Sequence, residues 1–347
     1  MVATLVLIVV AIVGAVAVAT IVGSIGTQAG NQANIGQAGS NSQETLSIGG
    51  STTVYPVLNG LTTGTGLAAS FEKSHPGVDI SLQQGGSGGG MTGVAQGVLD
   101  IGVTSSYATY QTAVANYPAA NLQAFEIGGS AVVMSGSIVN STGGAITSLT
   151  KAQLQAIYAS GSNGTFWIDA STGAVTVNSQ NGGSNFNQAY QRSDTSGTEE
   201  TFAKNYLGSG YYDSTSNQLL CTAPGVTGNE GMASQLQKSG NFLGFIDFGY
   251  AYSQTTGNAL FGILGVDGSR NIASSASVSL LKTDILTVLK GSTPAQTFPT
   301  ALTRNFYLVT AGNPNALELN FIKFCQGPDQ RSFFNVVGTF SIYDYKP

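Results

Sequence analysis

The residues best suited to chemistry lie in one short stretch, Arg192-Ser-Asp-Thr-Ser-Gly-Thr198, which continues directly as Glu-Glu-Thr-Phe-Ala-Lys. We interpret it as a loop that runs into a helix, capped by Ser196, with Glu199 at the spacing of a capping box. The N-terminus of a helix offers free N–H groups and partial positive charge, so it attracts anions. Arg192 adds a guanidinium that Asp194 could hold in place. The stretch therefore predicts either an ordinary capped helix or one wall of an anion site.

Two other loops share this design, Gly49-Gly-Ser-Thr-Thr53 and Gly85-Gly-Ser-Gly-Gly-Gly90. Each offers backbone N–H groups beside Ser or Thr hydroxyls, and its glycines let the chain close around a bound group. A buried anion is tolerated only when it is fully hydrogen-bonded. Many neutral donors and one guanidinium fork meet that demand for a tetrahedral oxyanion. If the three loops converge, they form a small oxyanion cavity.

The elements that must position these loops alternate between strands and helices. Short strands are expected at the start of 46–61, at the end of 71–84 and at the start of 100–106; the first two are each followed by a turn or loop and a helix, and the third by an exit loop. Later segments repeat the alternation, with a strand in 129–139 and an amphipathic helix in 148–161. Such alternation predicts a parallel α/β sheet. Ligands of these sheets bind beyond the carboxyl ends of the strands, where the three loops lie.

Composition excludes several other classes of function. Charged residues make up 8% of the 347-residue chain, and the net charge of −5 without a basic cluster argues against a nucleic-acid partner. The single histidine, His75, makes a histidine-ligated metal site or a Ser-His-Asp triad improbable. Cys221 and Cys325 show no metal spacing, and their redox state is left open. The candidate loops hold donors but no base, nucleophile or metal set, so we expect no cofactor and no enzyme.

The N-terminus is apolar over residues 1–23, and the first charged residue is Glu44. A helix of about 20 such residues would span a hydrocarbon core. A signal peptide would want a basic region before the apolar one, which is lacking here. A plain membrane anchor would lack the positive flank that fixes orientation. Residues 24–45 are rich in Gly, Asn, Gln and Ser, which predicts a flexible linker.

A third interpretation of residues 1–23 is a resemblance. An uncharged Val/Ile/Ala/Leu segment, then a polar linker, then a globular domain resembles a mature archaeal type IV pilin or archaellin. In those families a peptidase removes a basic leader, and the apolar helices pack together in the core of a filament. The resemblance implies self-association through residues 1–23, and we favour a filament over a membrane anchor.

The globular part, residues 46–347, resembles the periplasmic phosphate-binding protein of the phosphate ABC importer, a type II substrate-binding fold. The resemblance is carried by GSTTVYP at 50–56, GGSGGG at 85–90 with DIG thirteen residues after its serine, SLTKAQLQAIY at 148–158, RSDTSGT at 192–198 and NFLGFIDFGYAY at 241–252. It implies two α/β lobes with phosphate clamped between them. Lobe 1 would comprise 46–126 and 253–347, and lobe 2 would comprise 127–252. The crossovers would lie near residues 125–126 and 248–252.

The same resemblance implies a set of ligand contacts. The phosphate-binding residues would be Thr52, Thr53, Ser87, Ser105, Arg192, Ser196, Gly197 and Thr198. Asp194 would orient Arg192. Some members carry an Asp at the position of Ser105, where its carboxylate accepts the proton of hydrogen phosphate and so rejects sulfate. A serine hydroxyl can donate or accept, so discrimination against sulfate or arsenate is weaker here. Other branches have a Ser followed by an Arg, whereas Ser106 follows here, so a second cation is also expected to be absent.

We therefore predict an extracellular, non-enzymatic phosphate-binding protein displayed on the cell surface by its pilin-like helix, as a filament subunit. One alternative is a membrane-anchored receptor that delivers phosphate to an ABC permease. The other is a structural pilin whose binding-protein domain has no ligand.

Overall fold

The computed structural model describes residues 43–178 and 185–346. The predictions for residues 1–23 and for nearly all of the linker lie outside these ranges. Residues 45–347 form one compact unit of the chain. The first strand, β1 (Glu44–Gly50), begins inside the segment predicted as linker.

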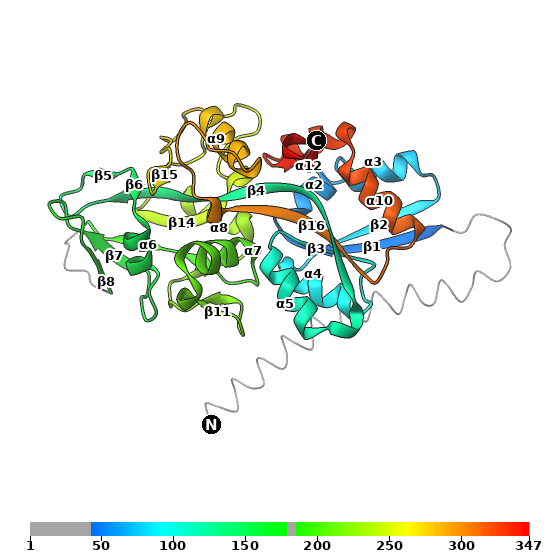
Figure 1. Ribbon diagram of the computed structural model, residues 1–347. Helices are drawn as coiled ribbons and strands as arrows, with labels where there is room; N and C mark the ends of the chain where they lie inside the picture. The colour runs from blue at the N-terminus through cyan, green and yellow to red at the C-terminus, as the bar shows by residue number, and fades with distance from the viewer. Residues whose placement is uncertain (1–42, 179–184, 347) are drawn as a thin grey trace, which may run out of the picture. The chain divides into compact units, whose positions relative to one another are not determined.

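A large mixed sheet runs through the described part of the chain (Figure 1). The order of its main strands is β2 (Val78–Gln84), β1, β3 (Ile101–Thr104), β16 (Thr303–Ala311), β4 (Leu122–Val139), β14 (Phe242–Asp247), β9 (Asn187–Ala189), β7 (Thr165–Ile168) and β8 (Val175–Val177). β1 and β3 are parallel, as are β14 and β9, but β16 runs antiparallel to both β3 and β4. The α/β class holds, but the predicted parallel arrangement fails at the centre of the sheet, where β16 is antiparallel to its neighbours.

The strands β4 and β16 explain this departure, because both pass from one lobe to the other. Residues 122–126 and 128–131 of β4 pair with β16, with a shift of register between them, and residues 132–137 pair with β14. On β4, Ile127 belongs to the apolar core of the first lobe and Ala131 to that of the second. On β16, Phe306 lies in the first core, and Leu302 just before the strand lies in the second. The two strands cross in opposite directions, so they pair antiparallel.

These cores correct the predicted division of the second half of the chain. Residues 253–302 were expected in lobe 1, and the return crossover near 248–252. Instead β15 (Ile263–Val266) pairs with β4 and with β6 (Ser148–Leu149), and the apolar face of α9 (Ser279–Leu289) packs into the second core. The chain returns only along β16, because the apolar residues before it are buried in lobe 2. Lobe 1 therefore comprises about residues 45–127 and 306–337.

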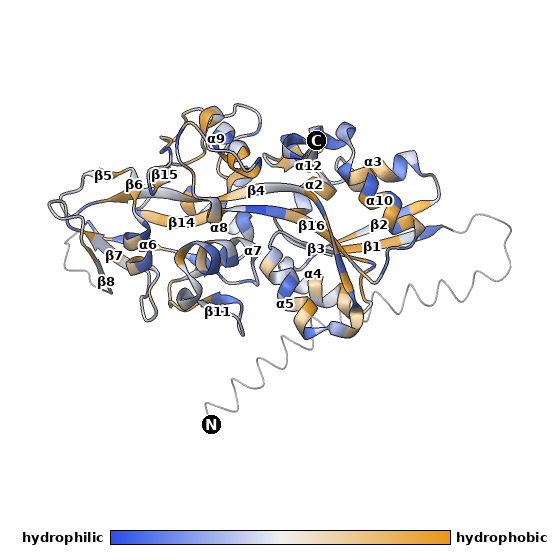
Figure 2. Cartoon of the chain, in the orientation of Figure 1, coloured by the Kyte–Doolittle hydropathy of each residue, from blue (hydrophilic) through white to orange (hydrophobic). Residues whose placement is uncertain are grey.

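Helices cover both faces of the sheet in lobe 1 (Figure 1). On one face lie α2 (Tyr55–Asn59), α3 (Leu67–Ser74) and α10 (Ala316–Gln326), and on the other lie α4 (Gly86–Ala95) and α5 (Tyr107–Asn116). Asn315 and Glu318 close a capping box at the start of α10, and Phe321, Ile322 and Cys325 are its buried face. Figure 2 shows apolar stretches along β1 and β4.

In lobe 2 the helices nearest the sheet are α6 (Lys151–Ile157), α7 (Gly197–Glu200) and α8 (Gly228–Leu236). The predicted helix within 148–161 is confirmed, and it starts at a capping box between Thr150 and Gln153. The short helix α7 continues as a π-helical segment, Thr201–Leu207, whose Phe202 and Ala203 are fully buried.

The glycine run after β2 is not a linker, because α4 begins inside it at Gly86. Gly86 has a φ of +71°, which favours glycine, and a Cβ there would lie 2.2 Å from the carbonyl oxygen of Thr195 in lobe 2. A Cβ on Gly90 would lie 2.6 Å from the carbonyl oxygen of Gly49 on β1. The run thus lets α4 approach both β1 and the opposite lobe.

Cys221 and Cys325 are both free thiols in the structure. Cys221 is buried in the core of lobe 2 and Cys325 in that of lobe 1. Within the described residues, every helix is too short or too polar to cross a bilayer.

Candidate anion-binding site

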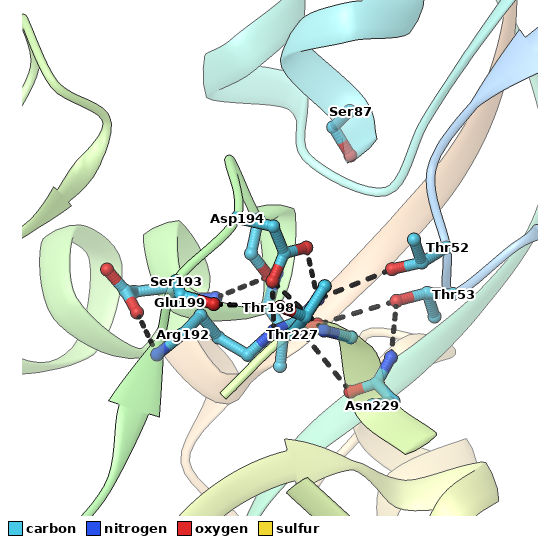
Figure 3. Close-up of polar contacts among 12 residues, drawn as sticks. Thr52, Thr53, Ser87, Arg192, Ser193, Asp194, Thr198, Glu199, Thr227 and Asn229 are labelled. Carbon is cyan, nitrogen blue, oxygen red and sulfur yellow. Dashed lines mark hydrogen bonds and ion pairs between the residues drawn. The ribbon is translucent and has the colours of Figure 1, made fainter. Parts of the chain in front are cut away.

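Arg192 is held by Asp194 in a two-point ion pair (Figure 3). Arg192 is on the short strand β10 (Gln191–Arg192) and is 1% exposed. Its Nε donates to Asp194 Oδ1 at 2.9 Å and its Nη2 to Oδ2 at 2.6 Å. Asp194 Oδ1 also accepts the N–H of Gly228, at the start of α8. A parallel pair of this kind fixes the plane of the guanidinium.

The other edge of Arg192 faces the opposite lobe. Its Nη2 lies 3.5 Å from Thr52 Oγ1, on the loop after β1, and its Nη1 lies 3.5 Å from Asn229 Oδ1. Both contacts are long, so the guanidinium keeps donor capacity on this side. Asn229 in turn donates to Thr53 Oγ1 at 3.1 Å, as Figure 3 shows.

Ser196 caps α7, with its hydroxyl accepting the N–H groups of Thr198 and Glu199. The predicted capping box is wrong, because the Glu199 carboxylate is turned to the backbone N–H groups of Arg192 and Leu219, each at 2.7 Å. Burial raises the pKa of Glu199 to about 7, although these two bonds lower it. Glu199 therefore stabilises the backbone of the loop that carries Arg192.

The hydroxyls of lobe 1 meet the tip of α7 across the interface between the lobes. Ser87 and Ser105 lie 3.4 Å apart, and a Cβ on Gly197 would be 2.9 and 2.8 Å from their hydroxyl oxygens. Thr53 Oγ1 lies 3.4 Å from Thr198 Oγ1. Only a residue without a side chain at position 197 lets α7 come this close. Apart from Thr52, which is half-buried, the predicted contact residues are buried.

The structure thus brings together all the sequence-predicted residues: Thr52, Thr53, Ser87, Ser105, Arg192, Ser196, Gly197 and Thr198, with Asp194 behind Arg192. Four come from three loops of lobe 1 and the others from one loop of lobe 2. Hydroxyls, amides and a guanidinium dominate the cluster, so it can surround an anion with donors.

The sequence analysis missed a second cation, Arg304 on β16. Arg304 is 5% exposed and forms an ion pair with Asp247, at 2.6 Å, at the end of β14. It also donates to Thr198 Oγ1 at 2.9 Å, Thr53 Oγ1 at 3.0 Å and Ser105 Oγ at 3.3 Å. The expectation that the site lacks a second cation is therefore wrong. Burial lowers the pKa of Arg304, and Asp247 opposes that shift.

One signal in the sequence could have revealed Arg304. The strand ALTRNFYLV is otherwise apolar or neutral, and a charge in such a strand must be paired to be buried. Its partner Asp247 stands in the equally apolar FLGFIDFGY. Asn229 carried no such signal, because amides are common on helix ends.

A second contact between the lobes lies beside the cluster. Glu200, on α7, accepts from the hydroxyls of Ser106, at 2.5 Å, and of Thr109. Lys204 pairs with the same carboxylate at 3.2 Å. Ser106 is also the N-cap of α5. This link holds the lobes together independently of the arginine cluster.

Among the described residues there is no group of His, Cys, Asp and Glu side chains arranged to hold a metal ion.

Comparison with known families identifies the class of protein. Residues 35–329 match the family described as PBP superfamily domain, PBP_like_2, so the chain belongs to that family. No curated protein matches the chain in sequence.

Solved structures share the fold at low sequence identity. An ABC-type phosphate transport receptor from Vibrio cholerae is 19% identical with a TM-score of 0.57, covering 86% of this chain and 100% of its own. A protein from Clostridium perfringens, assigned as a phosphate ABC transporter substrate-binding protein and solved with bound phosphate, is 19% identical with a TM-score of 0.55, covering 86% and 99%. A phosphate-binding protein from Stenotrophomonas maltophilia is 12% identical with a TM-score of 0.53, covering 85% and 90%. These similarities establish the two-lobed binding-protein fold.

Proposed function

We propose that the protein binds inorganic phosphate between its lobes. The observation that carries this proposal is the buried cluster in which Arg192, held by Asp194, and the tip of α7 meet hydroxyls from three loops of the opposite lobe. Such a set of directed donors stabilises an oxyanion that has lost its water. The phosphate-related names of the structural neighbours support the same ligand.

Binding would proceed by closure of the lobes. Because the contact residues are buried, an anion can reach them only when the lobes separate. β4 and β16 connect the two cores, and the chain crosses once more between Val337 and Phe340, so bending of these three connections is the natural hinge. Phosphate would then bridge Arg192 and α7 on one side with Ser87 and Thr52 on the other. This role needs no chemical step, so we propose a binding protein rather than an enzyme.

Calorimetric titration of the full-length chain with phosphate tests this function. We expect one site per chain in the wild type and no measurable heat of binding for Arg192→Ala. Arg331→Ala is the matched control, because Arg331 pairs with Asp344 and its side chain is half exposed. Absence of binding by a folded wild-type chain would refute the proposed function. Equal binding by wild type and Arg192→Ala would refute the proposed site.

We further propose that residues 1–23 display this domain outside the cell as the subunit of a filament. The support is compositional, an apolar segment without charge followed by a polar linker. The alternatives are a membrane-anchored receptor for an ABC permease, which the transport-receptor neighbours favour, and a structural pilin without a ligand. Electron micrographs of the fraction sheared from cells should show threads that contain the protein. A protein recovered only as a detergent-soluble monomer would refute the filament.

A further inference from the structure

The side chain of Arg304 organises hydroxyls of both lobes. Its Nη1 donates to Ser105 Oγ and Thr198 Oγ1, and its Nη2 donates to Thr53 Oγ1 and Asp247 Oδ2. A guanidinium has four terminal protons. All four are used within the protein, whereas the buried Nε proton has no partner among the described residues. The two terminal nitrogens of Arg304 therefore act on a ligand through the hydroxyls that they hold.

Thr53 shows the effect most clearly. A hydroxyl oxygen has two acceptor positions and one proton to donate. Thr53 Oγ1 accepts from Arg304 Nη2 at 3.0 Å and from Asn229 Nδ2 at 3.1 Å. Both acceptor positions are filled, so Thr53 can only donate. Its proton must point to Thr198 Oγ1, 3.4 Å away, or to a ligand.

Ser105 is constrained in the same way. Its Oγ accepts from Arg304 Nη1 at 3.3 Å and from the hydroxyl of Ser51 at 3.0 Å. The Ser105 proton is then directed to Ser87 Oγ, at 3.4 Å, or to a ligand. Ser87 Oγ already accepts the backbone N–H of Ser105 at 3.2 Å. When Ser87 accepts from the Ser105 hydroxyl as well, its own proton is free to be donated to a ligand.

The carboxylates of the site are bound to cations and amides. Asp194 accepts from Arg192 and from the N–H of Gly228. Asp247 accepts from Arg304, from the hydroxyl of Ser130 and from the N–H of Gly249. Asp194 and Asp247 are therefore each committed to an arginine rather than offered to a ligand. Glu199 is committed to two backbone N–H groups, and Glu200 to two hydroxyls and Lys204.

We propose that Arg304 makes this a donor-only site, which binds a tetrahedral dianion without a proton, such as sulfate, at least as tightly as hydrogen phosphate. The inference rests on the proposed oxyanion function and specifies its ligand class. The P–OH group of hydrogen phosphate is a donor, and at Thr53 and Ser105 it meets hydroxyls whose acceptor positions are filled. A buried donor without a hydrogen-bond partner weakens binding of the ligand by about ten-fold or more. Sulfate has no such proton, and Arg304 is the positioning residue that creates the difference.

The experiment is calorimetric titration of the full-length chain with sulfate and with phosphate. It is carried out at about pH 6 and about pH 8, below and above the ionisation that converts dihydrogen phosphate to hydrogen phosphate. We expect sulfate to bind at least as tightly as phosphate at both pH values. The ratio of phosphate to sulfate affinity should rise with pH, because dihydrogen phosphate brings a second unsatisfied proton. Phosphate binding that is tighter than sulfate binding at about pH 8 would overturn the inference and leave the proposed function standing. Failure to bind either anion would overturn both.

The ratio is chosen because protein groups near the site also titrate or carry charge. These groups are Arg192, Asp194, Glu199, Glu200, Glu230, Asp247 and Arg304. Their protonation affects both dianions alike, so it cancels in the ratio and leaves the proton of the ligand.

Arg304→Lys tests the positioning role. A lysine ammonium lacks the planar fork and cannot hold three hydroxyls and Asp247 together, so Ser105 or Thr53 regains an acceptor position. We expect the phosphate-to-sulfate ratio to rise about ten-fold, while Arg331→Lys leaves it unchanged. An unchanged ratio in a folded Arg304→Lys protein would overturn the role of Arg304. If that variant does not fold, the wild-type ratio decides the inference.

Discussion

Replacing Gly197 with Ala should weaken phosphate binding without weakening the fold. The new Cβ would lie 2.8 Å from Ser105 Oγ and 2.9 Å from Ser87 Oγ, closer than real Cβ contacts come. Both serines are 1% exposed and hydrogen-bonded, so neither side chain can move away without losing hydrogen bonds. Both belong to the opposite lobe, so separating the lobes relieves the clash. The cost therefore falls on the closed state.

Overpacking of this kind costs about 1–3 kcal/mol, which corresponds to about 5- to 150-fold weaker binding. Calorimetry with phosphate measures the loss, and thermal unfolding without phosphate should change little. Gly89→Ala is the matched control, because Gly89 lies in α4 of the same site and its Cβ would meet nothing within 4 Å. Binding by Gly197→Ala equal to that of wild type would refute the closed arrangement of α7 against Ser87 and Ser105.

Three other substitutions test separate parts of the structure. Glu199 has a raised pKa of about 7 in the folded protein, against about 4.5 in the unfolded chain. Its contribution to stability is therefore fully present below about pH 4.5 and is lost as the pH rises through about 7. The loss amounts to roughly 3 kcal/mol. In chemical denaturation between those pH values, Glu199→Gln should flatten the slope of stability with pH, and an unchanged slope would contradict the assignment. Glu200→Gln removes the charge that joins α7 to Ser106. Phosphate binding measured by calorimetry should weaken about ten-fold, with little loss of stability. Unchanged affinity would show that this contact does not contribute to closure of the lobes. Phe321→Ala empties a fully buried position of α10 and should destabilise the fold by about 3–5 kcal/mol in denaturant unfolding, and a loss under about 1 kcal/mol would contradict its core position.

The two-lobed α/β fold could be predicted because its signals are local. Strand–turn–helix alternation and the loop motifs at 50–56, 85–90 and 192–198 each occupy one continuous stretch. The capped helix after Thr150 could be read from four residues. The position of the return crossover could not be predicted. The lobe to which residues 253–302 belong depends on which apolar core they enter, and both cores accept similar side chains.

The loops of the site could be predicted from the sequence, but the hydrogen bonds that connect them could not. Glu199 has the spacing of a capping box, yet it bonds to Leu219, twenty residues away, because the buried backbone of the arginine loop needs acceptors. Arg304 lies 112 residues beyond Arg192 in sequence, and only the antiparallel crossing of β4 and β16 brings it beside Thr53 and Thr198. Contacts of this kind depend on tertiary structure and leave little trace in local pattern.

The most direct measurement of the central claim is an experimental structure of the full-length chain with saturating phosphate. We predict a tetrahedral anion between the lobes, within hydrogen-bond distance of the Arg192 guanidinium, the hydroxyls of Ser87 and Thr198, and the loop at Thr52. Phosphate bound elsewhere, or closed lobes with phosphate excluded from this cluster, would contradict the account.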